Sequence, residues 1–458
     1  MKQLYKYQQD ALNKALLYDR YLLALDMGLG KTFTALKWLE KIKQTNNYNT
    51  IILVDSKKVL DWKEESENVG LENIEAFLNT KDNEKFLDFN QERNKIYILS
   101  YARFRSILKQ NKNFNIEYFF NLIVDESQVL KDSKSQLTKI LLSKTNLINK
   151  LLLLSGDPIS TGYHNLYSQM KLLNIFENEF KYSDFQYHFC KIFTIPKKYI
   201  PIITGYKNVD KLLDLLKSRA HFLKTEEAVD LPQKRAHQRI VKINKHYLNF
   251  KKDHALIEQE WSASGNTTIK YFHNLRQLAS GVIKTESGEY KKVDDAKFDE
   301  LKDLIESSTF NFSLFYNYKA ELHFIKKLLE ELKIKYFEIN GQKNELKDAL
   351  NYDGRFIILI QYASGSRGID GLQNKIFNQI YFSLTYSGEM YKQSLKRIHR
   401  LGQENKVNYY FLLAENSIEK NILDCLKNSQ DYTQEIFKKE FNIQDNQETK
   451  EKGDYEWN

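Results

Sequence analysis

The chain has 458 residues, and its 69 basic and 60 acidic side chains give a formal net charge of +9. This length suffices for about three domain-sized units, and the diffuse positive charge is compatible with a nucleic-acid partner without establishing one. Two widely separated cysteines argue against a disulfide framework and against a zinc site. The apolar runs are too short for a signal peptide or a membrane span, so we expect a cytoplasmic protein without membrane contact.

The first part of the chain predicts a helix over residues 4–18 and then short apolar runs that alternate with amphipathic stretches. The runs are rich in Ile, Leu and Val and end at polar clusters; they cover residues 21–25, 50–54, 96–99, 122–124 and 151–154. This pattern is typical of a parallel sheet buried on both faces and connected by helices. Ligands of such sheets bind at the carboxyl ends of the strands, where the polar clusters fall.

The pattern changes at about residue 163, where helical periodicity dominates and prolines interrupt it. A second alternating region follows, with strands expected at residues 313–316, 336–339, 356–360, 379–383 and 407–413. We therefore expect an α/β protein with four parts: a first lobe over residues 1–162, a mostly helical insertion over 163–290, a second lobe over 291–430 and a C-terminal tail over 431–458.

Residues 24–32, ALDMGLGKT, lie between a predicted strand and a predicted helix. Such a turn binds phosphates, because free N–H groups and the helix dipole face the anion. In this reading the backbone of Gly28, Leu29 and Gly30 approaches the phosphates, Lys31 reaches the β- and γ-phosphates, and Thr32 ligates Mg²⁺. The full phosphate-loop spacing has a glycine at position 25, where this chain has leucine. A glycine turn with a solvated lysine therefore stays open as an alternative.

Two further clusters suit phosphoryl chemistry. Asp125 and Glu126 end an apolar strand; the first would hold a metal ion, usually through water, and the second would polarise an attacking water. Arg397 and Arg400 are spaced to share one helical face and to grip a phosphoryl group. The alternatives are a solvated pair of turn carboxylates and a basic helix end that rests on DNA or faces solvent.

Together these motifs resemble a superfamily 2 helicase-type motor, and more narrowly the Swi/Snf-type ATPases, along almost the whole chain. The family's DEMGLGKT box corresponds to residues 25–32, its DEAH or DEGH box to DESQ at 125–128, and its TGTP motif to SGDP at 155–158. The arginine-finger motif QxxxRxHRxGQ matches residues 393–403 at all six specified positions. The resemblance implies two RecA-like lobes, ATP and Mg²⁺ as cofactors, and a DNA-dependent ATPase activity.

Shorter motifs extend the resemblance and assign further residues. LYKYQ at residues 4–8 resembles the adenine-reading element, which assigns that role to Gln8, and GSRGID at 365–370 replaces the GGxGxN motif. By the same resemblance Gly368 and Asp370 belong to the nucleotide site. The residues that would face the nucleic-acid backbone are Ser56, Lys57, Ser100, Tyr101, Tyr316 and Gly365.

The chain departs from the family where Gln128 replaces a histidine and Asp157 a threonine. These two positions bear on how ATP state is coupled to lobe movement rather than on hydrolysis. We expect a minimal bacterial or viral motor, monomeric, that moves on double-stranded DNA without separating the strands, with protein partners binding the insertion or the tail. A strand-separating DNA or RNA helicase is one alternative, and an ATP-regulated DNA clamp without significant turnover is another.

Overall fold

The computed structural model describes residues 3–110, 116–159, 162–177, 179–194, 201–365, 369–428, 432 and 436. Contacts within the chain define two compact units, Met1–Leu231 and Pro232–Asn458. The segment expected as an insertion, 163–290, is divided between these two units, and the four-part division of the chain remains a prediction. Among the described residues, no helix is both long and apolar enough to cross a membrane.

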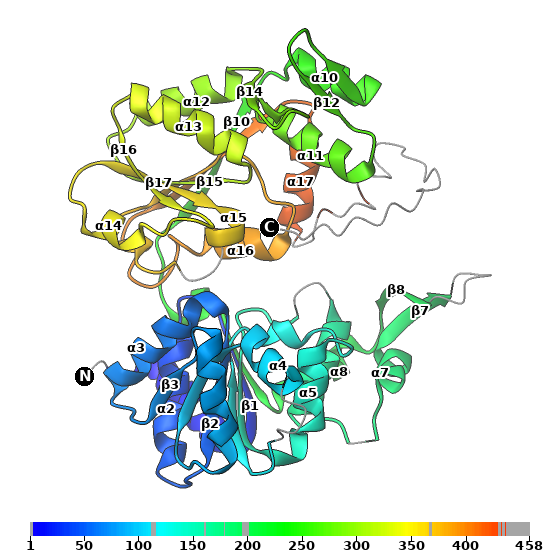
Figure 1. The fold of residues 1–458 in the computed structure, drawn as a ribbon, viewed down its shortest axis with the longest axis vertical. Coiled ribbons are helices and arrows are strands. Elements are labelled where there is room, and N and C mark those ends of the chain that lie inside the picture. The colour runs from blue at the N-terminus through cyan, green and yellow to red at the C-terminus, as the bar shows by residue number, and fades with distance from the viewer. Residues whose placement is uncertain are drawn as a thin grey trace. The chain divides into compact units, whose positions relative to one another are not determined.

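Unit 1 is built on a seven-stranded sheet in the order β3-β4-β2-β5-β6-β1-β9, in which every pair of neighbours is parallel. Its strands are β1 (Arg20–Leu25), β2 (Asn49–Val54), β3 (Ile74–Ala76), β4 (Ile96–Ser100), β5 (Phe120–Val124), β6 (Ile148–Leu154) and β9 (Ala220–Leu223). Strands β7 (Cys190–Thr194) and β8 (Pro201–Tyr206) form a separate antiparallel hairpin (Figure 1).

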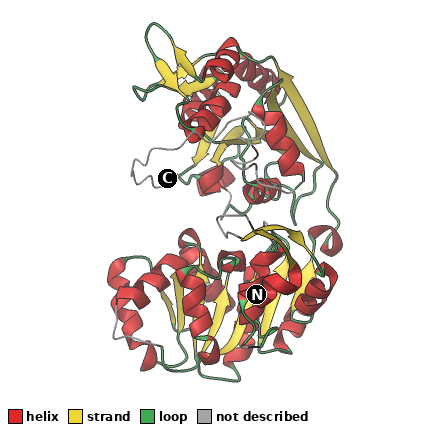
Figure 2. Ribbon diagram, turned by 90° about the vertical axis from the view of Figure 1, so that its right-hand side faces the viewer, coloured by secondary structure: helices red, strands yellow, loops and turns green. Residues whose placement is uncertain are grey.

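Helices cover both faces of this sheet (Figures 1 and 2). Alternate residues of each strand point to opposite faces, so Leu22 and Leu23 of β1 belong to different apolar clusters. One cluster packs against α1 (Lys6–Leu16), α2 (Lys31–Lys43) and α3 (Val59–Val69). The other packs against α4 (Tyr101–Gln110), α5 (Gln136–Ser143), α6 (Leu166–Leu172), α7 (Tyr182–Phe189) and α8 (Val209–Lys217). The short helix α9 (Thr225–Ala228) follows β9.

Unit 2 is built on a six-stranded parallel sheet in the order β10-β19-β18-β15-β17-β16. Its strands are β10 (Lys234–Val241), β15 (Phe312–Tyr316), β16 (Lys335–Ile339), β17 (Phe356–Gln361), β18 (Asn378–Tyr381) and β19 (Val407–Ala414). Two antiparallel pairs lie outside it: β11 (Ala255–Ile257) with β12 (Ser262–Ser264), and β13 (Val282–Lys284) with β14 (Tyr290–Lys292).

The two faces of this second sheet carry separate apolar clusters. One contains residues of α12 (Ala296–Glu306) and α13 (Lys319–Glu331). The other contains residues of α10 (Lys245–Asp253), α11 (Thr268–Ala279), α14 (Leu346–Asn351), α15 (Tyr362–Gly365), α16 (Gly388–Leu395) and α17 (Ile418–Lys427). The expected α/β class with two parallel sheets is therefore confirmed.

The structure adds strands that the sequence did not predict. Strands β3 and β9 form the two edges of the sheet in unit 1, and β10 forms one edge of the sheet in unit 2. Segment 163–290 contains hairpins besides its helices. The burial pattern of β10 explains why it was missed: six of its eight residues are exposed and the other two are half-buried, so it lacks the apolar run of a central strand.

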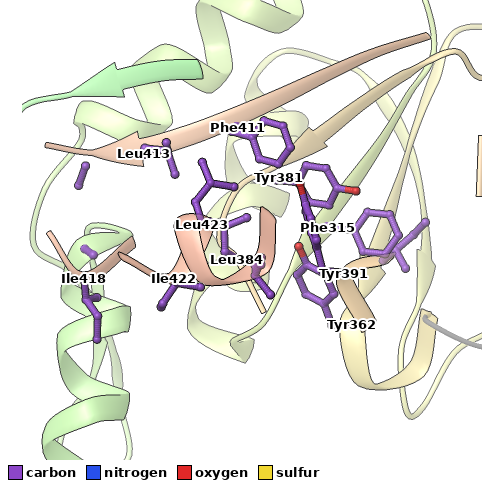
Figure 3. Packing of buried hydrophobic residues seen from close by; sticks show 14 of the residues in the cluster. Phe315, Tyr362, Tyr381, Leu384, Tyr391, Phe411, Leu413, Ile418, Ile422 and Leu423 are labelled. Carbon is purple, nitrogen blue, oxygen red and sulfur yellow. The ribbon is translucent and has the colours of Figure 1, made fainter. Parts of the chain in front are cut away.

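An aromatic cluster joins the sheet of unit 2 to α16 (Figure 3). The ring of Tyr381 stacks on Phe411 with centroids 4.8 Å apart and lies 5.7 Å from Phe315. The Tyr381 hydroxyl lies 2.9 Å from Ser394 Oγ, and Gln379 Nε2 donates to the Ser394 carbonyl oxygen over 3.1 Å. These contacts fix the last turn of α16, where the arginine motif begins.

A buried ion pair connects α12 and α17 of unit 2. Lys297 Nζ of α12 lies 2.6 Å from Glu419 Oε1 of α17, with side chains 1% and 3% exposed. Lys297 also donates to the Phe382 carbonyl oxygen, and Glu419 Oε2 accepts from the Ala414 N–H. Burial raises the pKa of Glu419 above its usual range, whereas Lys297 opposes that shift.

Lys297→Met leaves the Glu419 carboxylate buried without its cation, so we expect it to lower the free energy of unfolding of unit 2 by about 3–5 kcal/mol. Urea unfolding of the full chain measures this loss. Lys217→Met, which removes a largely exposed partner of Asp214, is the control and costs less than about 0.5 kcal/mol. Combining Lys297→Met with Glu419→Gln restores part of the loss; a double variant no more stable than Lys297→Met contradicts this account.

Candidate active site

The glycine loop lies between β1 and α2, where the sequence places it. Gly28 and Gly30 have φ angles of 87° and 72°, in the left-handed region that favours glycine. Gln8 of α1 crosses the loop, because its Nε2 donates to the Leu29 carbonyl oxygen over 2.9 Å. A Cβ atom on Gly30 would lie 2.3 Å from that nitrogen. The φ angle therefore favours glycine at position 30, and any larger residue there would displace the Gln8 side chain.

Lys31 is the first residue of α2, and its ammonium group turns back onto the loop. Lys31 Nζ donates to the carbonyl oxygens of Leu25, over 2.8 Å, and Asp26, over 3.3 Å. Burial lowers the pKa of Lys31, while the carboxylates of Glu126 and Asp125 favour its charged form. The next residue, Thr32, is half-buried in the first turn of α2.

Asp26 is hydrogen-bonded by a residue near the C-terminal end of unit 1. Its Oδ2 accepts hydrogen bonds from the hydroxyl of Thr225, over 2.8 Å, and from the Thr225 N–H, over 3.3 Å. Thr225 begins α9, directly after the edge strand β9. The glycine loop is thus fastened to the segment where the chain leaves this unit.

Asp125 follows β5 and is 2% exposed. Its Oδ1 accepts from the N–H of Glu126 over 3.0 Å, and its Oδ2 accepts from Trp62 Nε1 over 3.2 Å and from Lys58 Nζ over 3.3 Å. The hydroxyl of Tyr101 donates to the Asp125 carbonyl oxygen. Residues that follow β2 therefore hold the carboxylate at the end of β5, and Tyr101, which follows β4, holds the backbone there.

Glu126 has a left-handed backbone with φ 46°, which is uncommon outside glycine and persists only where its surroundings hold it. Its Oε2 accepts from Gln128 Nε2 over 2.8 Å. Gln128 Oε1 in turn accepts from the hydroxyl of Ser155 over 2.8 Å, and Ser155 Oγ accepts from the Asp157 N–H over 3.2 Å. Both departures from the family pattern lie in this one chain of hydrogen bonds.

The turn after β6 also touches the glycine loop. A Cβ atom on Gly156 would lie 3.4 Å from Met27 Cγ and 3.5 Å from Lys31 Nζ. Because β5, β6 and β1 are neighbours in the sheet, the loops after these three strands meet at its carboxyl edge. A half-buried lysine, the N-terminus of α2 and two carboxylates are thereby brought together.

These groups fit a nucleotide with its metal ion. Free N–H groups at the start of α2 and the Lys31 ammonium suit phosphate oxygens. Mg²⁺ commonly takes one or two protein ligands and completes its shell with phosphate and water oxygens, and the Thr32 hydroxyl and the Asp125 carboxylate are ligands of this kind. Within the described part of the chain, no group of three or more His, Cys, Asp or Glu side chains is placed to hold a metal ion.

In unit 2 the arginine motif meets the GSRGID segment. Arg397, which is 7% exposed, donates from Nη1 to the Ile369 carbonyl oxygen over 2.9 Å, and Arg400 forms an ion pair with Asp370. Gly368 lies outside the described residues. Both arginines therefore contact neighbouring residues of one segment.

The expectation that these arginines share a helical face is wrong. Helix α16 ends at Leu395, and both lie in the turns and bends that follow. Side chains bind the last carbonyl groups of the helix at this point: the Tyr409 hydroxyl donates to the Leu395 oxygen over 2.5 Å, and Gln379 Nε2 donates to the Ser394 oxygen over 3.1 Å.

The residues expected to face nucleic acid differ in exposure. Ser56 and Lys57 are exposed in the turn after β2. Ser100 is half-buried at the end of β4, where its Oγ accepts from the Arg103 N–H over 3.2 Å, and Tyr101 is half-buried against Asp125. Tyr316, at the end of β15, is 1% exposed, and Gly365 is the last residue of α15. Their role remains a prediction.

Residue types and spacing alone do not place Lys58 or Trp62 at the carboxylates. Neither residue is among the predicted site residues. One signal was available: Asp125 directly follows the apolar run 122–124. A carboxylate buried at such a strand end needs a cation or several hydrogen-bond donors.

The family profile described as the SNF2-related domain matches residues 7–295. An uncharacterized ATP-dependent helicase of Mycoplasma pneumoniae is 24% identical over 447 residues, which cover 92% of this chain and 40% of that protein. The human DNA annealing helicase and endonuclease ZRANB3 is 26% identical over 445 residues, covering 90% of this chain and 38% of that protein.

Among solved structures, the SWI2/SNF2 ATPase core of Sulfolobus solfataricus in complex with dsDNA is 17% identical, with a TM-score of 0.43 and coverage of 96% of this chain and 92% of that chain. The chain spans about two fifths of the length of the curated relatives named above.

Gly30→Ala tests the loop geometry. The alanine is strained at this φ and its Cβ displaces Gln8, so we expect nucleotide affinity to fall about tenfold or more. Gly70→Ala is a matched control, because Gly70 has a φ of 89° but its Cβ would meet nothing within 4 Å. Both variants lose about 1–2 kcal/mol of stability in urea unfolding, and only Gly30→Ala weakens binding of a fluorescent nucleotide. Equal affinities would contradict the contact with Gln8.

Proposed function

Because this chain belongs to the SNF2-related domain family, we propose that it is an ATP-driven motor that moves along double-stranded DNA without separating the strands. One observation carries the proposal: the loops after β1, β5 and β6 bring Lys31, Asp125 and Glu126 to one edge of the sheet. This set of groups suits hydrolysis of a metal-bound nucleotide.

In the proposed reaction the backbone of Gly28, Leu29 and Gly30 binds the phosphates, with Lys31 as their counter-charge and Gln8 setting the loop against α1. Thr32 and Asp125 would hold Mg²⁺, which supplies a positive charge at the transferring phosphoryl group when bound. Glu126, whose carboxylate is oriented by Gln128, would accept the proton of the attacking water.

Arg397 and Arg400 are the groups of unit 2 that we propose to stabilise the charge that develops on the phosphoryl group. Their contacts to Ile369 and Asp370 hold both guanidinium groups against the segment that replaces the GGxGxN motif. Gly368 and Asp370 belong to the same proposed nucleotide contacts.

DNA is the proposed track. The net charge of +9 and the exposed Ser56 and Lys57 suit contacts to phosphates, which are independent of base sequence and weaken with salt. Ser100, Tyr101, Tyr316 and Gly365 stay in the proposal as strand-end positions near such a track. A related protein carries the name DNA annealing helicase, which supports DNA as the nucleic acid.

The test compares ATP hydrolysis without nucleic acid and with duplex DNA, single-stranded DNA or RNA. The proposal expects the strongest stimulation by duplex DNA, together with displacement of a third strand but not of a paired strand. Strand separation would favour a helicase instead, and nucleotide binding without stimulated hydrolysis would favour a clamp.

Lys31→Ala removes the counter-charge of the phosphates, so we expect ATP turnover to fall about a hundredfold or more while the protein stays folded. Circular dichroism checks the fold and release of phosphate measures turnover. Lys41→Ala, an exposed position of the same helix, serves as the control and keeps wild-type turnover. Turnover that survives in Lys31→Ala would show that the site is elsewhere.

Gln128→Leu breaks the hydrogen bonds to Glu126 and Ser155, so we expect kcat to fall about tenfold or more with little change in nucleotide affinity. Gln128→His keeps most of the activity, because one imidazole tautomer donates to the carboxylate and accepts from the hydroxyl, as the amide does. Single-turnover hydrolysis and equilibrium binding separate the two effects. If Leu and His reduce kcat equally, Gln128 does not position Glu126.

A further inference from the structure

The side chain of Lys58 points towards Asp125, whereas the two residues before it are exposed. The Asp55 side chain accepts from the Lys57 N–H over 3.1 Å and the Asp55 carbonyl oxygen accepts from the Lys58 N–H over 2.9 Å. The resulting turn leaves Ser56 and Lys57 exposed, while the side chain of Lys58 is 22% exposed and reaches Asp125.

Trp62 lies in the first turn of α3, four residues after Lys58, which caps this helix, and it is 1% exposed. Residues four apart share a helical face, so Lys58 and Trp62 approach the same oxygen, Oδ2 of Asp125, over 3.3 and 3.2 Å. This placement gives a buried carboxylate one cation and one neutral donor.

A carboxylate offers about four lone-pair positions in total, two on each oxygen. In Asp125 the two on Oδ2 are used by Lys58 and Trp62, and one on Oδ1 by the N–H of Glu126. A divalent cation that uses Oδ2, directly or through water, has to take the place of one of these donors. The indole of Trp62 is fixed in the core between α3 and the sheet, whereas a lysine side chain has several rotatable bonds.

We propose that Lys58 competes with the divalent cation for Asp125, so that metal binding at this site is an exchange of one cation for another. This inference rests on the proposed function. The exchange keeps the carboxylate paired with a cation, although the divalent ion brings one more positive charge than the ammonium, and it sets the Mg²⁺ concentration that nucleotide binding requires. Lys58 is a positioning residue, because it acts through Asp125.

The experiment measures the Mg²⁺ concentration for half-maximal binding of a fluorescent ADP. Lys58→Met removes the competing cation, so this concentration falls about three- to tenfold. Lys58→Gln, which keeps a donor for Asp125 but no charge, shows a similar fall and stands in if the methionine variant does not fold. Lys58→Arg restores a cation and stays near wild type. Lys63→Met, on the same helix and paired with Glu67, keeps the wild-type value.

A second readout uses Mg²⁺ without nucleotide. In Lys58→Gln the metal raises the unfolding temperature by more than in the wild type, because Asp125 then has no lysine to release. A structural role alone would lower the unfolding temperature without changing this response to Mg²⁺. An unchanged or increased Mg²⁺ requirement in Lys58→Gln overturns the inference. If the wild-type protein does not bind the nucleotide at any Mg²⁺ concentration, the proposed function is overturned instead. The two failures are therefore distinguishable.

Discussion

The site depends on how one buried carboxylate is paired. Asp125 is almost inaccessible to solvent, and burying a charge is unfavourable unless donors and a counter-charge replace the water. Here the replacement comes from three directions: the N–H of Glu126, the indole of Trp62 and the ammonium of Lys58. Because these groups follow different strands, pairing the carboxylate also fixes the loops after β2 and β5 relative to each other. The left-handed backbone of Glu126 is retained in this setting.

The central strands were predictable because they are buried on both faces and read as continuous apolar runs, as in β2 and β17. Three of the four edge strands, β3, β9 and β10, were not, whereas the edge strand β16 was expected at residues 336–339. In β3 all three residues are half-buried, and in β10 most residues are exposed, so neither has the composition of a core strand. The end of α16 was also misjudged. No glycine or proline near Leu395 marks the end of the helix; the side chains that bind its last carbonyl groups, Tyr409 and Gln379, come from neighbouring strands of the sheet.

The glycine loop and its lysine were identified from spacing, since a phosphate cradle needs few residue types at fixed positions. The partners of the acidic strand end were beyond such reasoning. Residue spacing gives no sign that Lys58 turns inward while Lys57 faces solvent, because a single turn set by Asp55 decides it. The chain from Glu126 through Gln128 to Ser155 likewise joins residues whose complementarity as donors and acceptors is visible only in three dimensions.

The hydrogen bonds between Asp26 and Thr225 have a mechanical consequence. Thr225 stands close to Leu231, the last residue of unit 1, and the backbone from there is the covalent path into unit 2. Any displacement of the glycine loop stretches these two bonds or drags the start of α9 with it. The segment that leads into unit 2 is thus tied to the glycine loop by these side-chain bonds and by the pairing of β9 with β1.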